Sequence, residues 1–412
     1  MAIECEIAET GGLMGVYSEY LGKQLSFDQL SSERKVQLER ISSLRGRPIV
    51  VYASDITPKN NCPNSIDRSD LLPFNDQISS ISGDEIDIIL QTPGGFAEVV
   101  EDLVKIVRSK FNRVGIIVPG AAYSAGTIFT MAADEILMCP TSSLGPIDAQ
   151  IISNGKRFSA HAFLEGLKKI QKESAATGKL NIAYIPILQN ISPGEIQHCE
   201  NAQAFSKSLV TTWLKQYKFK FWDKHKSTGM GVTEEEKAER ADSIATKLCD
   251  QNEWLTHGRS IKIPDLESLR LQIIDYSKDA DLYDAINRYH TLLQMSFETN
   301  IYKMYETTTS QIYRMWQSTV GTQLPGIPMS GIPIMPIIPN SLLLDYFCAK
   351  CKTPQSIQVD FEQNIPLADG SIIFPRNNIL KCKNCNGESN LLGLRQQIEA
   401  QTGKKIIDGG TL

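Results

Sequence analysis

The chain has no run of eighteen apolar residues, so no segment predicts a transmembrane helix. Residues 1–10 contain acidic but no basic side chains, unlike the start of a secretory leader. The net charge of −5 provides no drive toward nucleic acid or anionic membrane surfaces. No G-x-x-x-x-G-K-[ST] motif occurs, so an ATP-driven motor would have to be a separate chain. We therefore expect a cytoplasmic protein that does not act on membranes or nucleic acid.

The chain does contain enough apolar material for more than one domain, because 42% of its 412 residues are hydrophobic. Composition and periodicity predict an N-terminal helical lead at 1–46, an α/β domain at 47–278, a helical extension at 279–320, a Pro/Gly-rich linker at 321–341, and a zinc ribbon with a C-terminal helix at 342–412.

Two strand–turn–helix units follow each other between residues 86 and 151. The first unit has the apolar run Ile86–Leu90, the turn Thr92–Gly95 and an amphipathic helix from Ala97 to Lys110. The second unit has the apolar run Val114–Val118 and a turn of small residues that leads into a second helix. Short strands that alternate with helices predict parallel βαβ units and an α/β fold.

The second helix begins at Ser124, which follows a strand through a sharp turn of small residues. Such a turn exposes a serine hydroxyl as a nucleophile for acyl transfer. The backbone N–H groups near Gly94 and Gly95, together with that of Ala125, could stabilise the oxyanion. Alternatively, Ser124 only caps the helix and the glycines only form tight turns. Because small residues occur in both turns, we favour the catalytic interpretation.

The same residues carry a family resemblance. The motifs are TPGG at 92–95, AYSAGT at 122–127, AADEI at 132–136 and SSLGPIDAQI at 142–151. They resemble the serine dehydrogenase proteinase family of the Clp/crotonase superfamily, which also includes signal peptide peptidase A and the Clp peptidases. The resemblance covers roughly residues 35–275. It implies stacked βαβ units with a helical arm, assembly into homo-oligomers, Ser124 as nucleophile, and an oxyanion hole at Gly94, Gly95 and Ala125.

The resemblance leaves the general base open. Clp peptidases carry a histidine about two dozen residues after the serine, where this chain has Leu144–Asp148 and no histidine. Their later triad aspartate corresponds here to Asn252. Relatives with a Ser-Lys dyad point to Lys156 as the base, which would need a lowered pKa.

Two histidines extend the alternatives. His161 has an ordinary pKa near the working range, and Asp148 could orient either His161 or Lys156. His257 could face the active site, although a structural role is the more common one for such a residue. Neither Lys156 nor His161 need be the base, and the sequence leaves these alternatives open.

Two C-x-x-C pairs stand near the C-terminus, Cys348 with Cys351 and Cys382 with Cys385. Four thiolates in this spacing predict a closed, structural zinc site, and strand-like runs between the pairs are typical of a zinc ribbon. A pair of disulfides is the alternative, but thiols stay reduced in the cytosol. We expect the ribbon to bind a substrate or a regulatory partner, such as a separate ATPase.

The region from Asp279 to Met315 has apolar residues at every third or fourth position and therefore predicts a long amphipathic helix. The residues that would share its apolar face are Leu282, Ile286, Tyr289, Leu293, Phe297, Ile301 and Met304. This face could pack against a partner subunit or within the body of its own chain.

The function that this sequence predicts is an intracellular serine peptidase, with Ser124 attacking a polypeptide that lies across the TPGG strand. One alternative is a catalytically silent oligomeric scaffold, favoured by the missing triad partners. Another is a crotonase-type enzyme that acts on an acyl thioester, in which the same glycines would hold an enolate oxygen.

Overall fold

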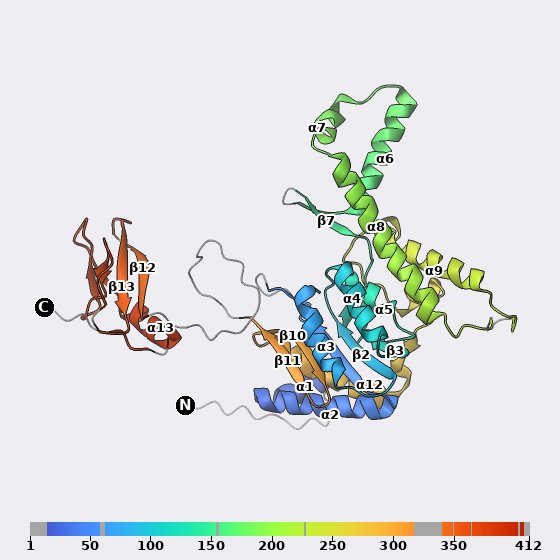
Figure 1. The fold of residues 1–412 in the computed structure, drawn as a ribbon, viewed down its shortest axis with the longest axis horizontal. Helices are drawn as coiled ribbons and strands as arrows, with labels where there is room; N and C mark the ends of the chain where they lie inside the picture. The colour runs from blue at the N-terminus through green and yellow to red at the C-terminus, as the bar shows by residue number, and fades with distance from the viewer. Residues whose placement is uncertain are drawn as a thin grey trace, which may run out of the picture. The chain divides into compact units, whose positions relative to one another are not determined.

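Alternating strands and helices build a parallel sheet with antiparallel additions at one edge (Figure 1). The computed structural model describes residues 15–57, 62–153, 156–225, 228–316, 340–348, 350–363, 365–402 and 404–407. The chain divides into two units, 1–320 and 321–412. Most of the linker expected at 321–341, up to residue 339, lies outside the described residues.

The main sheet of the first unit has seven strands in the order β11-β10-β1-β2-β3-β5-β9. Its parallel part confirms the α/β expectation. The strand bounds are β1 Ile49–Ser54, β2 Glu85–Gln91, β3 Arg113–Ile117, β5 Glu135–Met138, β9 Ile274–Asp275, β10 Ile301–Thr307 and β11 Gln311–Met315.

Helices cover both faces of this sheet, as expected for parallel strands that are apolar on both sides. Along β1, Val50 and Tyr52 join one core with α3 (Leu71–Ser79), α4 (Ala97–Arg108) and α5 (Ala125–Thr130). The intervening residues of β1 join a second core on the other face. That second core is closed by α2 (Phe27–Arg45) and α12 (Ala280–Phe297), and α1 (Val16–Gly22) packs beside α12.

The expected helical extension at 279–320 is wrong beyond its first half. The helix α12 ends at Phe297, and β10 and β11 follow as antiparallel strands, with β10 paired to β1. Ile301 and Met304 happen to continue the helical spacing, but β10 is rich in β-branched and aromatic residues, which favour a strand. The apolar face of α12 is buried within its own unit, in the core that also holds Leu38 and Ile41.

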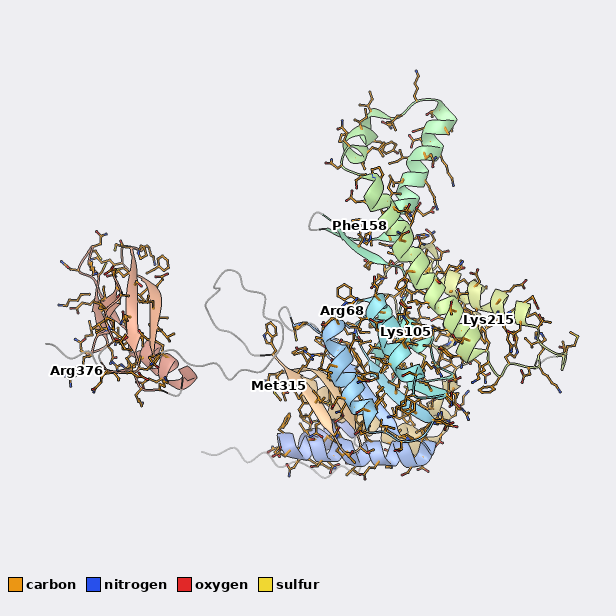
Figure 2. The ribbon with its side chains drawn as sticks, viewed as in Figure 1. Arg68, Lys105, Phe158, Lys215, Met315 and Arg376 are labelled. Atoms are coloured by element: carbon orange, nitrogen blue, oxygen red, sulfur yellow. The ribbon has the colours of Figure 1, made fainter. Side chains whose placement is uncertain are left out.

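A helical arm follows the second βαβ unit and stands away from the sheet (Figure 1). A hairpin of β7 (Gln150–Ser153) and β8 (Lys156–Ser159) leads into it, and Phe158 marks this hairpin in Figure 2. The arm contains α6 Ala160–Thr177, η2 Ile182–Tyr184, α7 Ile185–Leu188 and α8 Pro193–Trp213, after which come the π-helical turn η3 Leu214–Lys218 and the helix α9 Glu234–Cys249.

Short elements complete the first unit and position the site. They are η1 Arg68–Asp70, β4 Ala121–Ala122, β6 Ser143–Leu144, α10 Gln251–Trp254, α11 Ile263–Ser268 and η4 Tyr276–Lys278. The strands β4 and β6 pair in parallel and form a second small layer next to the carboxyl ends of β2 and β3. Among the described helices, none is both long and apolar enough to cross a membrane.

The second unit is a small β-rich module. Its strands are β12 Ser341–Phe347, β13 Pro354–Asp360, β14 Ile372–Ile373, β15 Ile379–Lys381 and β16 Glu388–Asn390, and the helix α13 spans Leu392–Thr402. Eight buried apolar residues, among them Ile357, Phe374 and Ile398, make up its core. A core of this size gives little stability, so a module like this usually needs a covalent or metal cross-link.

A network of ion pairs links residues at the amino ends of the parallel strands, and Glu135 of β5 is at its centre. Its carboxylate is 2.6 Å from Arg45 and 3.5 Å from Arg47, and it also bonds Arg113. Burial opposes ionisation of Glu135, but the hydrogen bonds from Arg45 and Arg113 outweigh it and lower its pKa to about 2.

This low pKa predicts a pH-dependent contribution to stability. Because the folded pKa is below the ordinary value of 4.5, the contribution is fully present above pH 4.5 and is lost as the pH falls toward 2. We expect Glu135→Gln to lower the free energy of unfolding at pH 7 by about 1–3 kcal/mol. Urea titrations at several pH values should show this difference shrinking as the pH falls. An equal loss at pH 3 and pH 7 would contradict the prediction.

Candidate active site

Ser124 stands at the strained turn that begins α5. Its φ of 52° and ψ of −114° are unusual for a residue other than glycine, and such strain is often found at functional sites. The side chain is partly exposed, and it accepts no capping hydrogen bond from the first turn of α5. The alternative in which Ser124 serves only as a helix cap therefore lacks the bond that would define it.

Glycines let the neighbouring turns approach Ser124 closely. A Cβ added to Gly94 would lie 2.8 Å from the Cβ of Ser124, and one added to Gly126 would lie 2.4 Å from Thr92. A Cβ on Gly145 would lie 2.9 Å from the ring of Tyr123. Any side chain at these glycines would push the TPGG turn away from the serine.

Two backbone N–H groups in the turns next to Ser124 are without a backbone partner among the described residues. The N–H of Gly94 donates to Thr92 Oγ1 at 3.2 Å. Gly94 therefore lets its turn lie close to Ser124, but its N–H is already used and is not a free donor for an oxyanion. Ile66 pairs with the turn through the carbonyl of Gly94 (2.7 Å) and the N–H of Phe96 (3.0 Å). Because N–H groups alternate in direction along an extended chain, the N–H of Gly95 points away from Ile66, to the other edge of the TPGG segment.

Ala125 supplies the second of these groups at the start of α5. Within the described part of the chain, neither Gly95 nor Ala125 uses its N–H in a backbone hydrogen bond. A Cβ on Gly94 would lie 3.4 Å from the nitrogen of Ala125, which places the two turns in contact. The N–H groups of Gly95 and Ala125 are therefore the candidates for an oxyanion hole.

A buried ion pair holds Ile66 in this position. Lys303 of β10 is only 1% exposed, and its Nζ donates to the carbonyl of Ser65 (2.6 Å) and to Asp70 (2.7 Å). Asp70 also accepts hydrogen bonds from the hydroxyls of Tyr52 and Tyr305. The segment that pairs with the TPGG turn is thus fixed to the sheet on both sides of Ile66.

Removing this lysine should destabilise the first unit strongly. Lys303→Met leaves the carboxylate of Asp70 buried without its cation, and we expect a loss of about 3–5 kcal/mol in the free energy of unfolding. Adding Asp70→Asn to the same chain should recover part of that loss, because no buried charge then remains. Urea unfolding of the two single variants and the double variant measures this coupling. Additive effects would show that the ion pair does not hold the segment.

A carboxylate and an imidazole meet beside the same turn. His257 Nδ1 lies 2.7 Å from Asp148 Oδ1, and Asp148 is 1% exposed. Gln150 donates to the other oxygen of Asp148 at 2.9 Å. No described residue bonds Nε2 of His257, which is therefore available to accept a proton.

Both members of this pair are tied to the serine turn. Asp148 follows Gly145, whose added Cβ would lie 3.4 Å from the nitrogen of Ser124. The loop that carries His257 is anchored by Ile261, which exchanges two backbone hydrogen bonds with Leu144 of β6. Ser260 of that loop lies 3.3 Å from the hydroxyl of Tyr123. The fold thus brings the segments that carry Asp148 and His257 into contact with the turn that carries Ser124.

Comparison with known proteins identifies a family for part of the chain. Residues 77–196 match the family model of the ClpP-like SDH-type serine proteinases. The recognition made from the sequence motifs is therefore confirmed for this segment, which includes Gly94, Ser124 and Asp148. His257 and the four cysteines of the two C-x-x-C motifs lie outside the matched residues.

Curated relatives cover a shorter stretch. Two uncharacterized proteins of Methanocaldococcus jannaschii, MJ1495 and MJ0137, are each 38% identical to this chain over 66 residues. That stretch is 16% of this chain, and the chain spans 23% of the length of each relative.

Solved structures of the 1510-N membrane-bound stomatin-specific protease are also similar to parts of the chain. A serine-to-alanine mutant has 24% identity and a TM-score of 0.22, over 28% of this chain and 60% of its own. A lysine-to-alanine mutant in complex with a substrate peptide has 16% identity and a TM-score of 0.23, over 47% of this chain and 80% of its own.

The other residues considered as bases or triad partners have different contacts, or side chains that are not among the described residues. Lys156 begins β8, and its side chain lies outside the described residues. His161 is the second residue of α6, where its Nε2 is 3.8 Å from Asp250. Asn252 lies in the short helix α10.

The remaining histidines have other surroundings. His225 contacts Glu236 at 3.0 Å, and His198 is exposed on α8. Burial lowers the pKa of His290 to about 4, and its Nε2 bonds Gln91 at 3.0 Å. Among the described histidines, His257 is the one that contacts Asp148 next to the serine turn.

The four cysteines of the second unit come together as a cluster. Their sulfurs all lie within 4.8 Å of one another, with Cys348 and Cys385 at 3.7 Å and Cys351 and Cys382 at 3.6 Å. A hydrogen bond with Thr353 lowers the pKa of Cys351 to about 6, which favours the thiolate that binds metals. The cluster can hold a metal ion.

Proposed function

We propose that this chain is a serine peptidase in which Ser124 is the nucleophile, His257 the general base and Asp148 the residue that orients the imidazole. One observation carries the proposal: the 2.7 Å contact of His257 with Asp148 beside the strained turn of Ser124. The match of residues 77–196 to a serine proteinase family supports it. The order along the chain is Ser, Asp, His, so the acid and the base exchange places relative to the Clp order.

The proposed reaction follows from the contacts of each group. Asp148 accepts a hydrogen bond from Nδ1–H of His257 and holds the tautomer in which Nε2 is unprotonated, so Nε2 can take the proton of the Ser124 hydroxyl. The serine oxygen attacks the scissile carbonyl, and the N–H groups of Gly95 and Ala125 stabilise the resulting oxyanion. His257 then gives its proton to the leaving amine. Water, activated by the same imidazole, hydrolyses the acyl-enzyme.

The TPGG turn supports an extended polypeptide as substrate. Ile66 occupies one edge of this turn, while the main chain of Gly95 faces the other edge. An extended peptide can align its carbonyl with Ser124 by lying along that second edge. Phe96, which is 62% exposed, lies next to it and offers an apolar surface to a substrate side chain.

The proposed activity is tested by labelling with a fluorophosphonate, which reacts with activated serines. Intact mass should show one adduct on the folded chain and none after denaturation, because the oxyanion donors exist only in the fold. Peptide mapping should locate the adduct on the fragment that contains Ser124. No adduct on a folded chain would favour the silent scaffold.

Zinc is the metal that we propose for the cysteine cluster. In a tetrahedron of thiolates with Zn–S bonds of about 2.3 Å, the sulfurs lie about 3.8 Å apart. The two sulfur–sulfur distances of 3.6 and 3.7 Å in the structure are close to this value. Zinc bound there would stabilise the small core of the second unit and would not take part in hydrolysis.

Loss of one cysteine should therefore remove the metal. We expect native mass spectrometry to find one zinc ion per wild-type chain and none in Cys382→Ser. The thermal transition of the second unit should fall to a lower temperature in that variant, since zinc and folding are coupled. Cys199→Ala, a buried cysteine of α8, is the matched control and should retain zinc. Full zinc content in Cys382→Ser would contradict the assignment.

A cytoplasmic, homo-oligomeric enzyme completes the proposal. The buried cysteines Cys139, Cys199 and Cys249 are free thiols, which is typical of a reducing compartment. The helical arm offers apolar side chains at its tip for association, among them Ile182 and Ile187, which are 78% and 52% exposed. Light scattering of the purified chain measures the oligomeric state.

A further inference from the structure

We propose that the chain binds a phosphate-bearing anion in a pocket between the end of α8 and the start of α9. The pocket has a volume of about 500 Å³ and lies within the first unit. Its lining residues are Thr211, Thr212, Lys215, Gln216, Lys220, Glu234 and Lys237. None of the residues around Ser124 lines it, so this proposal is independent of the peptidase activity.

Positive charge dominates the pocket. Three lysines face a single carboxylate, that of Glu234, in a chain whose overall charge is −5. Glu234 contacts Lys237 at 3.2 Å and Lys215 at 3.9 Å. With one carboxylate shared by two ammonium groups, the pocket retains an excess of positive charge.

Lys237 is the most constrained of the three lysines. Its side chain is 9% exposed, although an ammonium group carries three protons and is costly to bury without partners. In the described part of the chain, its ionic partner is Glu234, which is itself 65% exposed. An anion in the pocket would satisfy the remaining donors of this buried ammonium.

A buried hydroxyl supplies a second, independent sign of a ligand. Thr211 is one of the lining residues, and its Oγ1, which is shielded from solvent, has no hydrogen-bond partner among the described residues. Buried hydroxyls are normally hydrogen-bonded, so an unpartnered one needs an explanation. Rotation of the Thr211 side chain toward the pocket would let the hydroxyl donate to an oxygen of a bound anion.

The backbone at the pocket is also irregular. The π-helical turn Leu214–Lys218 follows α8 and carries Lys215, which is labelled in Figure 2. Such turns often occur at functional sites, because the extra residue redirects side chains. Here Lys215, within the turn, and Lys220, just after it, line the same pocket as Thr211, which lies about one helical turn before Lys215.

Phosphate is the ligand group that fits these donors best. Its tetrahedral oxygens accept from several ammonium and hydroxyl groups at once, and lysine is a common partner of phosphate. A volume of about 500 Å³ is in the range of small-molecule sites and leaves room for a nucleotide or a polyphosphate. The shared chemistry is therefore a di- or triphosphate group.

Isothermal titration of the full chain with inorganic pyrophosphate at low salt tests the proposal. We expect saturable binding by the wild type and at least tenfold weaker binding by Lys237→Met. Thr211→Val should weaken binding about two- to fivefold, which corresponds to one lost hydrogen bond. Lys207→Met is the matched control, because Lys207 of α8 pairs with Asp242 and does not line the pocket, and it should bind like the wild type.

Several results would overturn the proposal. They are no saturable binding by the wild type, equal weakening by Lys237→Met and Lys207→Met, or equally tight binding of citrate, which would exclude a preference for phosphate. Circular dichroism checks that each variant folds. If Lys237→Met does not fold, Thr211→Val and Lys215→Met decide, and unchanged affinity in both would contradict the site. The affinity for ATP is then compared with that for pyrophosphate. Tighter binding of ATP indicates a nucleotide site, and equal or weaker binding indicates a polyphosphate site.

Discussion

Ser124→Ala should abolish fluorophosphonate labelling and lower peptide hydrolysis by a factor of about 10³ or more. The substitution removes the only oxygen that can form the acyl-enzyme, and it leaves the N–H groups of Gly95 and Ala125 in place. The residual rate should reflect these donors alone, as in serine hydrolases that have lost their nucleophile. Intact mass and a peptide-release assay measure the two effects.

The control for this experiment is a serine that adjoins a different helix. Ser109 follows α4 and is exposed, so Ser109→Ala should label like the wild type. The Ser124→Ala chain should also fold normally, because the methyl group of alanine is smaller than the hydroxymethyl group it replaces. An adduct of equal yield on Ser124→Ala would show that another residue is the nucleophile.

His257→Ala and Asp148→Asn should each slow acylation by about 10²–10⁴. Without His257, no base takes the proton from the serine. Without a charged Asp148, the imidazole loses the group that holds its tautomer and its orientation. Because the two residues act as one unit, the double variant should be hardly slower than His257→Ala alone. Fluorophosphonate labelling, stopped at successive times, gives the acylation rate of the two single variants and the double variant.

His161→Ala and Lys156→Ala serve as comparisons, since the sequence alone left both as candidates. The structure pairs His161 with Asp250, 3.8 Å away. We expect His161→Ala and Lys156→Ala to label within about threefold of the wild-type rate. If Lys156→Ala stops labelling while His257→Ala does not, the enzyme uses a Ser-Lys dyad and the proposed base is wrong. Circular dichroism excludes unfolding as the cause of a lost signal.

The parts of the site that the sequence could predict are those that a few consecutive residues build. The TPGG and Ser-Ala-Gly turns need small residues at adjacent positions, and the strands before them are continuous apolar runs. The cysteine pairs are recognisable in the same way, because each pair forms one short knuckle. The two paired edge strands at 301–315 were missed, since Ile301 and Met304 also fit a helical period and only pairing with β1 selects the strand.

The order of the proposed triad could not be predicted from spacing. Asp148 and His257 are separated by 109 positions, and nothing local to either residue indicates the other. The sequence named Asp148 as a residue that could orient His161 or Lys156, but it did not pair Asp148 with His257. The signal was an exchange of residue types between the two positions, with Asp148 in the first segment and His257 close to Asn252 in the second.

The sequence by itself determined the α/β class, the serine turn with its glycines and the four-cysteine cluster, because short-range geometry and residue chemistry are enough for each. The tertiary structure decided which histidine meets Asp148, that Ile66 backs the TPGG turn, and that Lys303 and Asp70 hold it there. The physical reason is the same in each case: these contacts join segments far apart in the chain, and they form only when the sheet and the loops at its edge have packed together.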